Sequence, residues 1–260
     1  MGGATLATLQ AGQFNVPCEA ILFDKDGTLF QFMMLWGNWA ESVLTGMEKR
    51  LTFLGKDFTG SIAGVLGTRH DQLGQVCGYD LRGPLAMATI EETHGILAWQ
   101  LYAAGVPWNE ALVQAIQICK DAMLDLRQNK PIVLMNGLLH FLQECEAASI
   151  RLGVVTSDET SSTVEQLHWA GISHYFEVII GRDQVSQGKP HPEMVEKASH
   201  ALGIESQNIV VIGDTNADMQ MGKQAGVKLT IGISTLNEST ECLLDADVMI
   251  TDYRDLKLKA

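Results

Sequence analysis

Two pairs of aspartates in this sequence are spaced so that both side chains of each pair lie on one side of the chain. Asp24 and Asp26 follow the short apolar run 20–23, and Asp214 and Asp218 lie four residues apart where another apolar run gives way to a helical pattern. Alternate residues of an extended segment share a face, and so do residues four apart on a helix. Close carboxylates repel one another unless a cation or a shared proton lies between them. Four converging carboxylates therefore predict a site for a hard divalent cation, and Mg²⁺ fits because it keeps water and phosphate oxygens in its shell.

Further groups are of the types that bind phosphate. Lys189, in the sequence Lys-Pro-His-Pro, supplies a positive charge for phosphate and for crowded carboxylates. Thr156 offers a hydroxyl, Ser157 offers a hydroxyl and a backbone N–H, and Gly27 completes the expected phosphate-binding set. This combination indicates phosphoryl transfer through an aspartyl phosphate, in which one carboxylate attacks phosphorus and a metal neutralises charge. Asp26 could protonate the leaving alcohol and then deprotonate the attacking water.

Alternating strand and helix patterns predict how the chain positions these residues. After residue 136, strands are expected at 152–155, 176–180, 209–212, 227–231 and 248–250, with helical patterns between them. Such alternation is typical of right-handed βαβ units. We therefore predict an α/β fold with a Rossmann-like, doubly wound parallel sheet. The polar clusters follow the strand ends, where sheets of this kind bind their ligands.

The stretch between the first strand and residue 136 has a different character. Its apolar residues recur at helical spacing over 36–54, 84–104 and 107–127, and prolines stand at two of the expected helix starts. We predict an all-helical cap domain over residues 31–132, inserted into an α/β catalytic core formed by residues 18–30 and 133–260. Residues 1–17 are expected to be a flexible N-terminal tail.

At these residues the sequence resembles the haloacid dehalogenase-like (HAD) superfamily of phosphohydrolases, from about residue 18 to residue 252. The run Asp24-Lys-Asp-Gly-Thr is similar to the first family motif, which implies Asp24 as nucleophile and Asp26 as general acid and base. Thr156 and Lys189 are similar to the second and third motifs, and the segment 213–218 is similar to the fourth.

The same resemblance implies a set of Mg²⁺ ligands and a branch of the superfamily. The ligands would be the carboxylates of Asp24 and Asp214 and the backbone carbonyl of Asp26, with Asp218 nearby or one layer further out. The position of the insert, directly after the first motif, is similar to the helical cap of the phosphoglycolate phosphatase and β-phosphoglucomutase-like branch. The resemblance thus implies a Mg²⁺-dependent phosphomonoesterase whose substrate is a small phosphorylated metabolite, such as phosphoglycolate or a sugar phosphate.

Two departures from the family pattern bear on the alternatives. Lys25 fills a position that is often Leu, Phe or Met in relatives, and the sequence alone assigns it no role. Residues 30–40 lack the histidine that sugar-phosphate mutases of this branch tend to carry, which disfavours a mutase. A mutase remains the alternative among enzymes, and a catalytically idle scaffold that binds partners remains the alternative outside them. In the insert, Arg69, His70 and Arg82 are weak candidates for residues that select the substrate.

Composition limits the partners and the location. The 260 residues carry 31 acidic and 18 basic side chains, a net charge of −13, which disfavours nucleic acid. A bound cation at the carboxylates would make this acidity compatible with a small phosphate ester. The sequence has no apolar run of about 18 residues, so we predict no membrane contact, and we expect a cytoplasmic monomer or homodimer. Its five cysteines form no CxxC pair and are expected to be buried free thiols.

Overall fold

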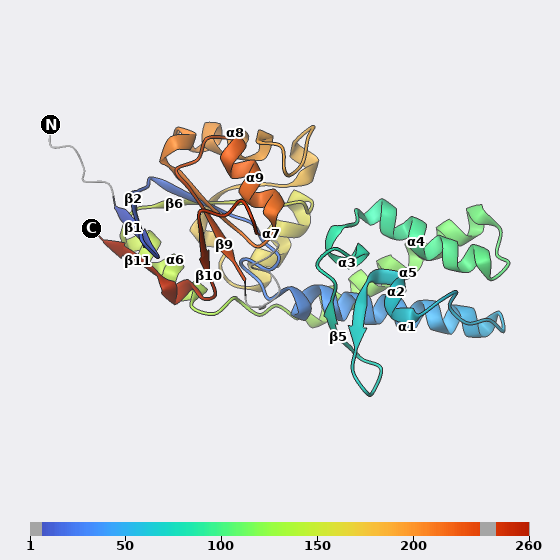
Figure 1. The fold of residues 1–260 in the computed structure, drawn as a ribbon. Coiled ribbons are helices and arrows are strands. Elements are labelled where there is room, and N and C mark those ends of the chain that lie inside the picture. Colours follow the sequence, from blue (N-terminus) through green and yellow to red (C-terminus); the bar gives the residue numbers. More distant parts are fainter. Residues whose placement is uncertain (1–6, 235–242, 260) are drawn as a thin grey trace, which may run out of the picture. The chain divides into compact units, whose positions relative to one another are not determined.

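The chain forms two compact units in the computed structural model, which describes residues 7–234 and 243–259 (Figure 1). The first unit comprises residues 1–31 and 132–260, and the second comprises residues 32–131. The second unit is thus an insertion within the sequence of the first.

A parallel sheet of six strands forms the centre of the first unit. In spatial order the strands are β10 (Val248–Ile250), β9 (Leu229–Ile233), β8 (Ile209–Gly213), β3 (Ala20–Phe23), β6 (Arg151–Val155) and β7 (Phe176–Ile180). Strands buried on both faces are apolar throughout rather than alternating, which is why β3 and β8 read as continuous apolar runs. The predicted doubly wound parallel sheet is confirmed.

Helices cover both faces of this sheet, as the strand–helix alternation predicts. They are α6 (Leu138–Ala147), α7 (Thr160–Trp169), α8 (Glu193–Leu202) and α9 (Asn216–Gln224), with short 3-10 helices at Ser173–Tyr175, Arg182–Gln184, Ser206–Asn208 and Tyr253–Asp255. Ile21 and Phe23 of β3 pack in one core with α6 and α7, whereas Ala20 and Leu22 pack in a second core with α8 and α9. Figure 1 shows α8 and α9 on one side of the sheet and α6 on the other.

A second, antiparallel sheet joins the two ends of the first unit. Its strands lie in the order β11 (Leu256–Lys259), β1 (Thr8–Ala11) and β2 (Phe14–Pro17). The prediction of a flexible tail over residues 1–17 is therefore wrong for residues 8–17, and residues 1–6 lie outside the described part. Leu9 and Ala11 are fully buried in the core. The sequence pattern did not indicate these strands because β1 and β2 have only four residues each, and the other partner of β1, β11, lies at the opposite end of the chain.

The second unit is built mainly of helices. They are the π-helix Met33–Gly37, α1 (Asn38–Phe53), α2 (Ile62–Leu66), α3 (Pro84–Met87), α4 (Ile90–Ala103) and α5 (Trp108–Asn129). Helix α5 packs against both α1 and α4. One correction applies to the all-helical prediction: β4 (Thr68–His70) and β5 (Val76–Tyr79) form an antiparallel hairpin. These strands are too short to give an alternating pattern that stands out among helices.

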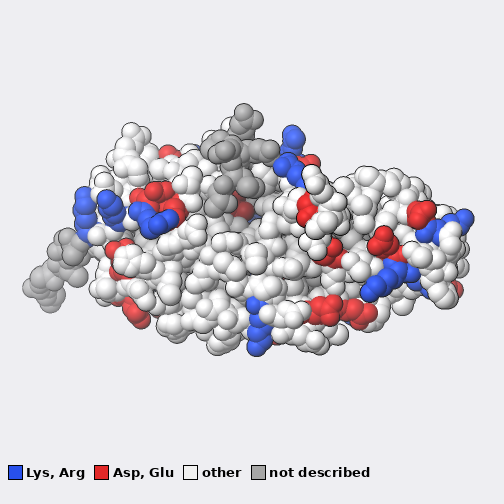
Figure 2. All heavy atoms as spheres, turned by 90° about the horizontal axis from the view of Figure 1, so that it is seen from below, with Lys and Arg blue, Asp and Glu red and all other residues white. Residues whose placement is uncertain are grey.

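The cysteines, the polarity of the helices and the surface charges bear on three further expectations from the sequence. Cys18, Cys119 and Cys145 are buried free thiols as predicted, but Cys77 is exposed, and Cys242 lies outside the described residues. Within the described ranges, the helices are either too short or too polar to cross a lipid bilayer. On the face drawn in Figure 2, the described Lys and Arg side chains form small groups that lie beside Asp and Glu side chains.

Candidate active site

The carboxyl ends of three neighbouring strands bring the predicted motifs together. In the parallel register, Phe23 of β3 lies beside Ile212 of β8 and Val154 of β6. The residues that follow these strands therefore emerge at one edge of the sheet. The backbone N–H of Asp24 extends the β3–β8 pairing by donating to the Ile212 carbonyl, with an N···O distance of 2.9 Å.

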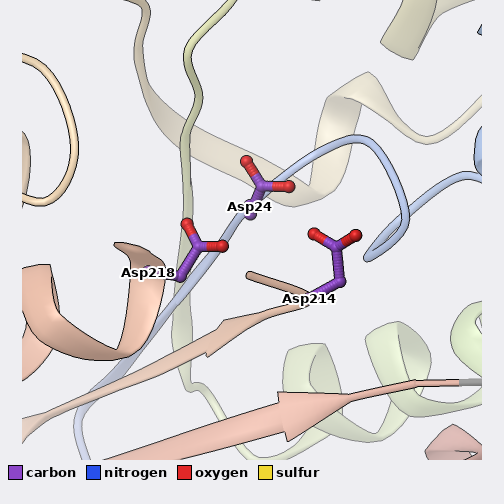
Figure 3. A group of neighbouring side chains, drawn as sticks. All are labelled: Asp24, Asp214 and Asp218. Atoms are coloured by element: carbon purple, nitrogen blue, oxygen red, sulfur yellow. The ribbon is translucent and has the colours of Figure 1, made fainter. Parts of the chain in front are cut away.

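Three aspartates form a carboxylate cluster at this edge. Asp24 follows β3, Asp214 follows β8, and Asp218 lies in the first turn of α9 (Figure 3). One oxygen from each carboxylate lies within 4.8 Å of the others. Asp24 and Asp218 are buried, so water can offset little of their mutual repulsion. Hard oxygen ligands at this spacing fit a divalent cation such as Mg²⁺, which would supply the missing positive charge.

Lys189 lies beside two of these carboxylates. Its side chain is only 6% exposed, and its ammonium group pairs with Asp24 Oδ1 and, at 2.5 Å, with Asp218 Oδ1. Burial alone would lower the pKa of Lys189, but the carboxylates of Asp218 and Asp24 outweigh it and raise the pKa. The lysine therefore stays charged and offsets part of the negative charge of the cluster.

The carboxylates themselves are harder to ionise than ordinary aspartates. Burial raises the pKa of Asp24 to about 7, although the charge of Lys189 opposes the shift. Burial, with the nearby charges of Asp24 and Asp218, also holds the pKa of Asp214 well above its usual range. Buried like charges that resist ionisation are a common feature of functional sites, because a bound cation can relieve them.

Asp26, the fourth predicted carboxylate, lies outside this cluster. Both of its oxygens accept hydrogen bonds from the Lys25 ammonium group, at 2.8 and 2.7 Å. Lys25 is fully buried and requires anionic partners, and Asp26 is the next residue in the chain. The structure thus brings together three of the four carboxylates that the sequence predicts to converge.

Asp218 serves its own helix as well as Lys189. Its Oδ2 accepts hydrogen bonds from the backbone N–H of Thr215 at 3.1 Å and from the Thr215 hydroxyl at 2.5 Å. Thr215 Oγ1 in turn accepts from the Asp218 N–H at 3.3 Å, which completes a capping box at the start of α9. This double bonding fixes the Asp218 carboxylate beside the ammonium of Lys189.

Gly27 is placed by a close approach of backbone to Asp214. Its φ of +79° lies in the left-handed region, and a Cβ atom there would lie 2.0 Å from Asp214 Oδ2. The neighbouring Thr28 hydroxyl lies 3.5 Å from Asp214 Oδ1. The glycine thus has a steric reason for its place in the loop, which is independent of the phosphate contact expected from the sequence.

Thr156 and Ser157 differ in their surroundings. Thr156 is buried, its backbone N–H donates to the Ile180 carbonyl at 3.0 Å, and its Oγ1 accepts from the Asp158 N–H at 3.2 Å. Because the hydroxyl oxygen accepts in that bond, its hydrogen can be donated to another group, such as a phosphate oxygen. Ser157 is exposed.

The three weak candidates in the second unit have different environments. Both ring nitrogens of His70 are bonded within the hairpin, Nδ1 to the Gly74 carbonyl at 2.9 Å and Nε2 to Thr68 Oγ1 at 2.8 Å. A carbonyl only accepts, so Nδ1 carries a hydrogen. Arg69 and Arg82 are exposed. The two hydrogen bonds of His70 stabilise the hairpin, so they explain the presence of this residue without a contact to substrate.

Sequence reasoning did not find the partners of Lys25. Its ammonium also lies 2.9 Å from Asp158 Oδ2 and 2.5 Å from Gln166 Oε1. A signal was present, because Lys25 stands between two aspartates at a position where relatives are often apolar. The sequence alone could not show that acceptors from the loop after β6 and from α7 would surround it.

Comparison with known families supports the family resemblance, over a range that begins after the first motif. The family model for haloacid dehalogenase-like hydrolases matches residues 78–231, which is more than half of the chain. The chain belongs to the haloacid dehalogenase-like hydrolase family. The predicted family resemblance is thereby confirmed.

Curated proteins that resemble the chain include several phosphatases. A pyrophosphatase PpaX from Halalkalibacterium halodurans is 30% identical over 46% of this chain and 56% of its own length. A validoxylamine A 7'-phosphate phosphatase from Streptomyces hygroscopicus is 31% identical over 48% of this chain and 58% of its own length. The chain spans about half the length of the curated relatives it matches.

Solved structures of HAD-like proteins share the fold over most of the chain. A HAD-superfamily hydrolase from Geobacter sulfurreducens has a TM-score of 0.61 at 20% identity, covering 92% of this chain and 94% of its own. A β-phosphoglucomutase from Clostridium difficile has a TM-score of 0.56 at 18% identity, covering 90% and 91%. At these identities the likeness concerns the fold.

Proposed function

We propose that the chain is a Mg²⁺-dependent phosphomonoesterase that hydrolyses a small phosphorylated metabolite through an acyl phosphate of Asp24. The observation that carries the proposal is the buried cluster of Asp24, Asp214 and Asp218 with the ammonium of Lys189 beside it. A group of anions with one resident cation is suited to hold a metal ion and a phosphate together. The names of the curated relatives also favour phosphate chemistry.

Each residue has a role that its position supports. Asp24 attacks phosphorus, and Lys189 offsets charge on the phosphate oxygens as they approach the carboxylates. Thr156 donates its free hydroxyl hydrogen to a phosphate oxygen. Mg²⁺, held by Asp24 and Asp214 with the Asp26 carbonyl, would neutralise and orient the phosphate. Asp218 fixes Lys189 and lies close enough to contact the metal through water.

Asp26 is proposed to move the protons. It gives one to the leaving alcohol and later takes one from the water that hydrolyses the aspartyl phosphate. Each carboxylate oxygen has two lone pairs, so a hydrogen bond from Lys25 does not by itself prevent Asp26 from accepting a proton. Ser157 is proposed to donate its backbone N–H to a phosphate oxygen. The Gly27 N–H already donates to the Phe30 carbonyl at 2.9 Å, so Gly27 is assigned the steric role of letting the loop approach Asp214.

The inserted unit is proposed to act as a cap. The two chain segments that lead to it are paired with each other: the Gln31 N–H donates to the Val133 carbonyl at 2.8 Å, and the Met135 N–H donates to the Leu29 carbonyl at 2.9 Å. A paired hinge a few residues from Asp26 would let the insert move as one body and exclude water when substrate is bound. Arg69 and Arg82 remain candidates for contacts with the substrate.

A phosphatase assay on a panel of esters tests this function. The panel should include phosphoglycolate, sugar phosphates and pyrophosphate, each with and without Mg²⁺, and should compare the wild-type chain with Asp24→Asn. We expect Mg²⁺-dependent release of inorganic phosphate from at least one ester and its loss in the variant. Full activity in Asp24→Asn, or no metal-dependent turnover of any ester, would rule out the proposed mechanism. Phosphate retained on a sugar product would indicate a mutase.

A further inference from the structure

Lys25 is the centre of a buried polar network beside the proposed catalytic groups. Its side chain is fully buried. The ammonium group bonds both oxygens of Asp26 at 2.8 and 2.7 Å, lies 2.9 Å from Asp158 Oδ2, and donates to Gln166 Oε1 at 2.5 Å. An ammonium group has three hydrogens, so these three residues can satisfy all of them.

The three partners of Lys25 come from three separate segments. Asp26 belongs to the loop after β3, Asp158 to the loop after β6, and Gln166 to the middle of α7. A single buried cation therefore ties the loop that carries Asp24 and Asp26 to the loop that carries Thr156. A hydrophobic residue at position 25 could fill the same space but could not form these bonds.

The hydrogen-bond network of Lys25 extends to the Thr156 hydroxyl through one further hydrogen bond. Lys25 holds the Asp158 side chain, and the Asp158 backbone N–H donates to Thr156 Oγ1 at 3.2 Å. That bond sets which way the Thr156 hydrogen is free to point. Lys25 thus acts at once on the orientation of a proton-transfer group and on that of a phosphate-binding group.

We propose that Lys25 is a positioning residue, which holds the Asp26 carboxylate and the loop of Thr156 and Asp158 in one fixed arrangement around the reacting phosphate. The proposal rests on the proposed function, because it assigns Lys25 to the same site. Lys25 acts through Asp26 and Asp158 and is assigned no contact with the substrate. Displacement of a catalytic group by about 1 Å is enough to cost large factors in rate, so a buried tie of this kind matters for catalysis.

Three variants separate this role from a general effect on folding. Lys25→Met keeps the volume and removes the contacts with all three partner residues. Asp158→Ala removes a side chain that is 26% exposed and is one partner of Lys25, and does not alter either residue of the Lys25–Asp26 pair. Arg151→Met is the matched control: it removes an ion pair with Glu177 at the opposite end of β6.

The leaving group of the substrate gives a readout that a loss of stability would not produce. An alkyl phosphate needs a proton on its leaving oxygen, whereas p-nitrophenolate leaves without one. We expect Lys25→Met to lower kcat on an alkyl phosphate by about the hundredfold that positioned proton transfer contributes. With p-nitrophenyl phosphate, the first turnover should stay fast and later turnovers slow down, giving a burst of about one nitrophenolate per active site. Asp158→Ala should instead raise KM for both esters and produce no burst.

Hydrogen exchange provides a second readout that needs no activity. Lys25→Met and Asp158→Ala should speed backbone exchange in residues 156–160 while exchange in β8 stays as in the wild type; Arg151→Met should leave residues 156–160 unchanged. Lys25→Met behaving as Arg151→Met in both measurements would overturn the proposal. If Lys25→Met does not fold, the proposal is tested with Asp158→Ala alone. An unchanged KM and unchanged exchange in residues 156–160 of that variant would overturn it. If the wild-type chain turns over no ester, the proposed function fails, and the exchange data still decide whether Lys25 ties the two loops.

Discussion

At the scale of single residues, the site depends on a balance of buried charges. Asp24, Asp214 and Asp218 place their carboxylates within reach of one cation, and Lys189 supplies part of the positive charge they need. Each group is held by ordinary structural bonds, such as the capping box that fixes Asp218. Asp24 and Asp214 follow the ends of β3 and β8, and Asp218 lies in the first turn of α9. These three side chains are also those proposed to bind metal and phosphate.

Removing the positive charge of Lys189 should weaken both catalysis and folding. Lys189→Met leaves buried carboxylates without their partner, a change that typically costs about 3–5 kcal/mol of unfolding free energy. We expect kcat/KM to fall by roughly 10²–10³, the usual effect of losing a group that stabilises developing charge. Denaturant unfolding and steady-state kinetics measure the two effects. Lys197→Met is the matched control, because Lys197 is an exposed lysine on α8. Equal behaviour of the two variants would contradict the role of Lys189.

Mg²⁺ affinity should depend on pH through Asp24. Burial raises the pKa of Asp24 to about 7, so below this pH a proton competes with the metal for its carboxylate. The affinity should therefore weaken as the pH falls below about 7, by about tenfold per pH unit for each proton displaced. Asp214, whose pKa is also raised, adds to this dependence. Calorimetric titration with Mg²⁺ in buffers of different ionisation enthalpy counts the protons released. An affinity that is constant between about pH 6 and pH 8 would argue against metal binding at Asp24.

At the scale of elements, parallel strand order positions the site. β8, β3 and β6 are neighbours in one sheet, so the residues that follow them meet at one edge even though they are far apart in sequence. The loop after β3 then turns sharply at Gly27, directly against Asp214. The geometry of this turn decides how close the first and fourth motifs can approach.

A side chain at position 27 should disturb the carboxylate cluster. Gly27→Ala places a methyl group 2.0 Å from the original position of Asp214 Oδ2, in a backbone conformation with φ of +79°. Gly203→Ala is the matched control, because Gly203 has φ of +65° and open space within 4 Å of the position that a Cβ would take. Both variants should lose about 1–2 kcal/mol from the left-handed backbone alone. Only Gly27→Ala should also lose Mg²⁺ affinity and phosphatase activity, and equal metal affinity in the two would contradict the account.

The sequence was sufficient to predict most elements of the first unit, because buried parallel strands and amphipathic helices have strong local patterns. Strand β7 and helix α7 have the bounds that the pattern indicates. Strands β1 and β2 were missed because each has only four residues, and because β1 also pairs with β11 across the whole chain, a contact that no local pattern records. The hairpin of β4 and β5 was missed because it is short and lies among helices.

The candidate site was predicted in its residue types more fully than in its contacts. Spacing and strand ends were enough to single out Asp24, Asp214 and Lys189. Spacing could not show that Asp26 bonds Lys25 instead of joining the other carboxylates, since that depends on the burial of a neighbouring lysine. The network of Lys25 with Asp158 and Gln166 needs three segments placed in space, and a sequence alone does not place them.

At the scale of the whole molecule, the net charge of −13 makes an anionic substrate unexpected unless a cation is bound at the site. Without metal, the carboxylate cluster should repel phosphate despite Lys189. We therefore expect excess chelator to abolish binding of inorganic phosphate as well as turnover, and added Mg²⁺ to restore both. Calorimetric titration with inorganic phosphate measures the binding. Unchanged phosphate affinity in excess chelator would contradict the need for a metal.

The central claim is that Asp24 carries the phosphate during turnover, and trapping the intermediate tests it most directly. The protein is mixed with Mg²⁺ and a hydrolysed ester, quenched in acid within the first turnover, digested, and mapped by mass spectrometry. The account predicts one phosphorylated peptide containing Asp24, sensitive to hydroxylamine, and absent from Asp24→Asn and from samples with chelator. Turnover without any covalent phosphate, or phosphate on a residue other than Asp24, would contradict it.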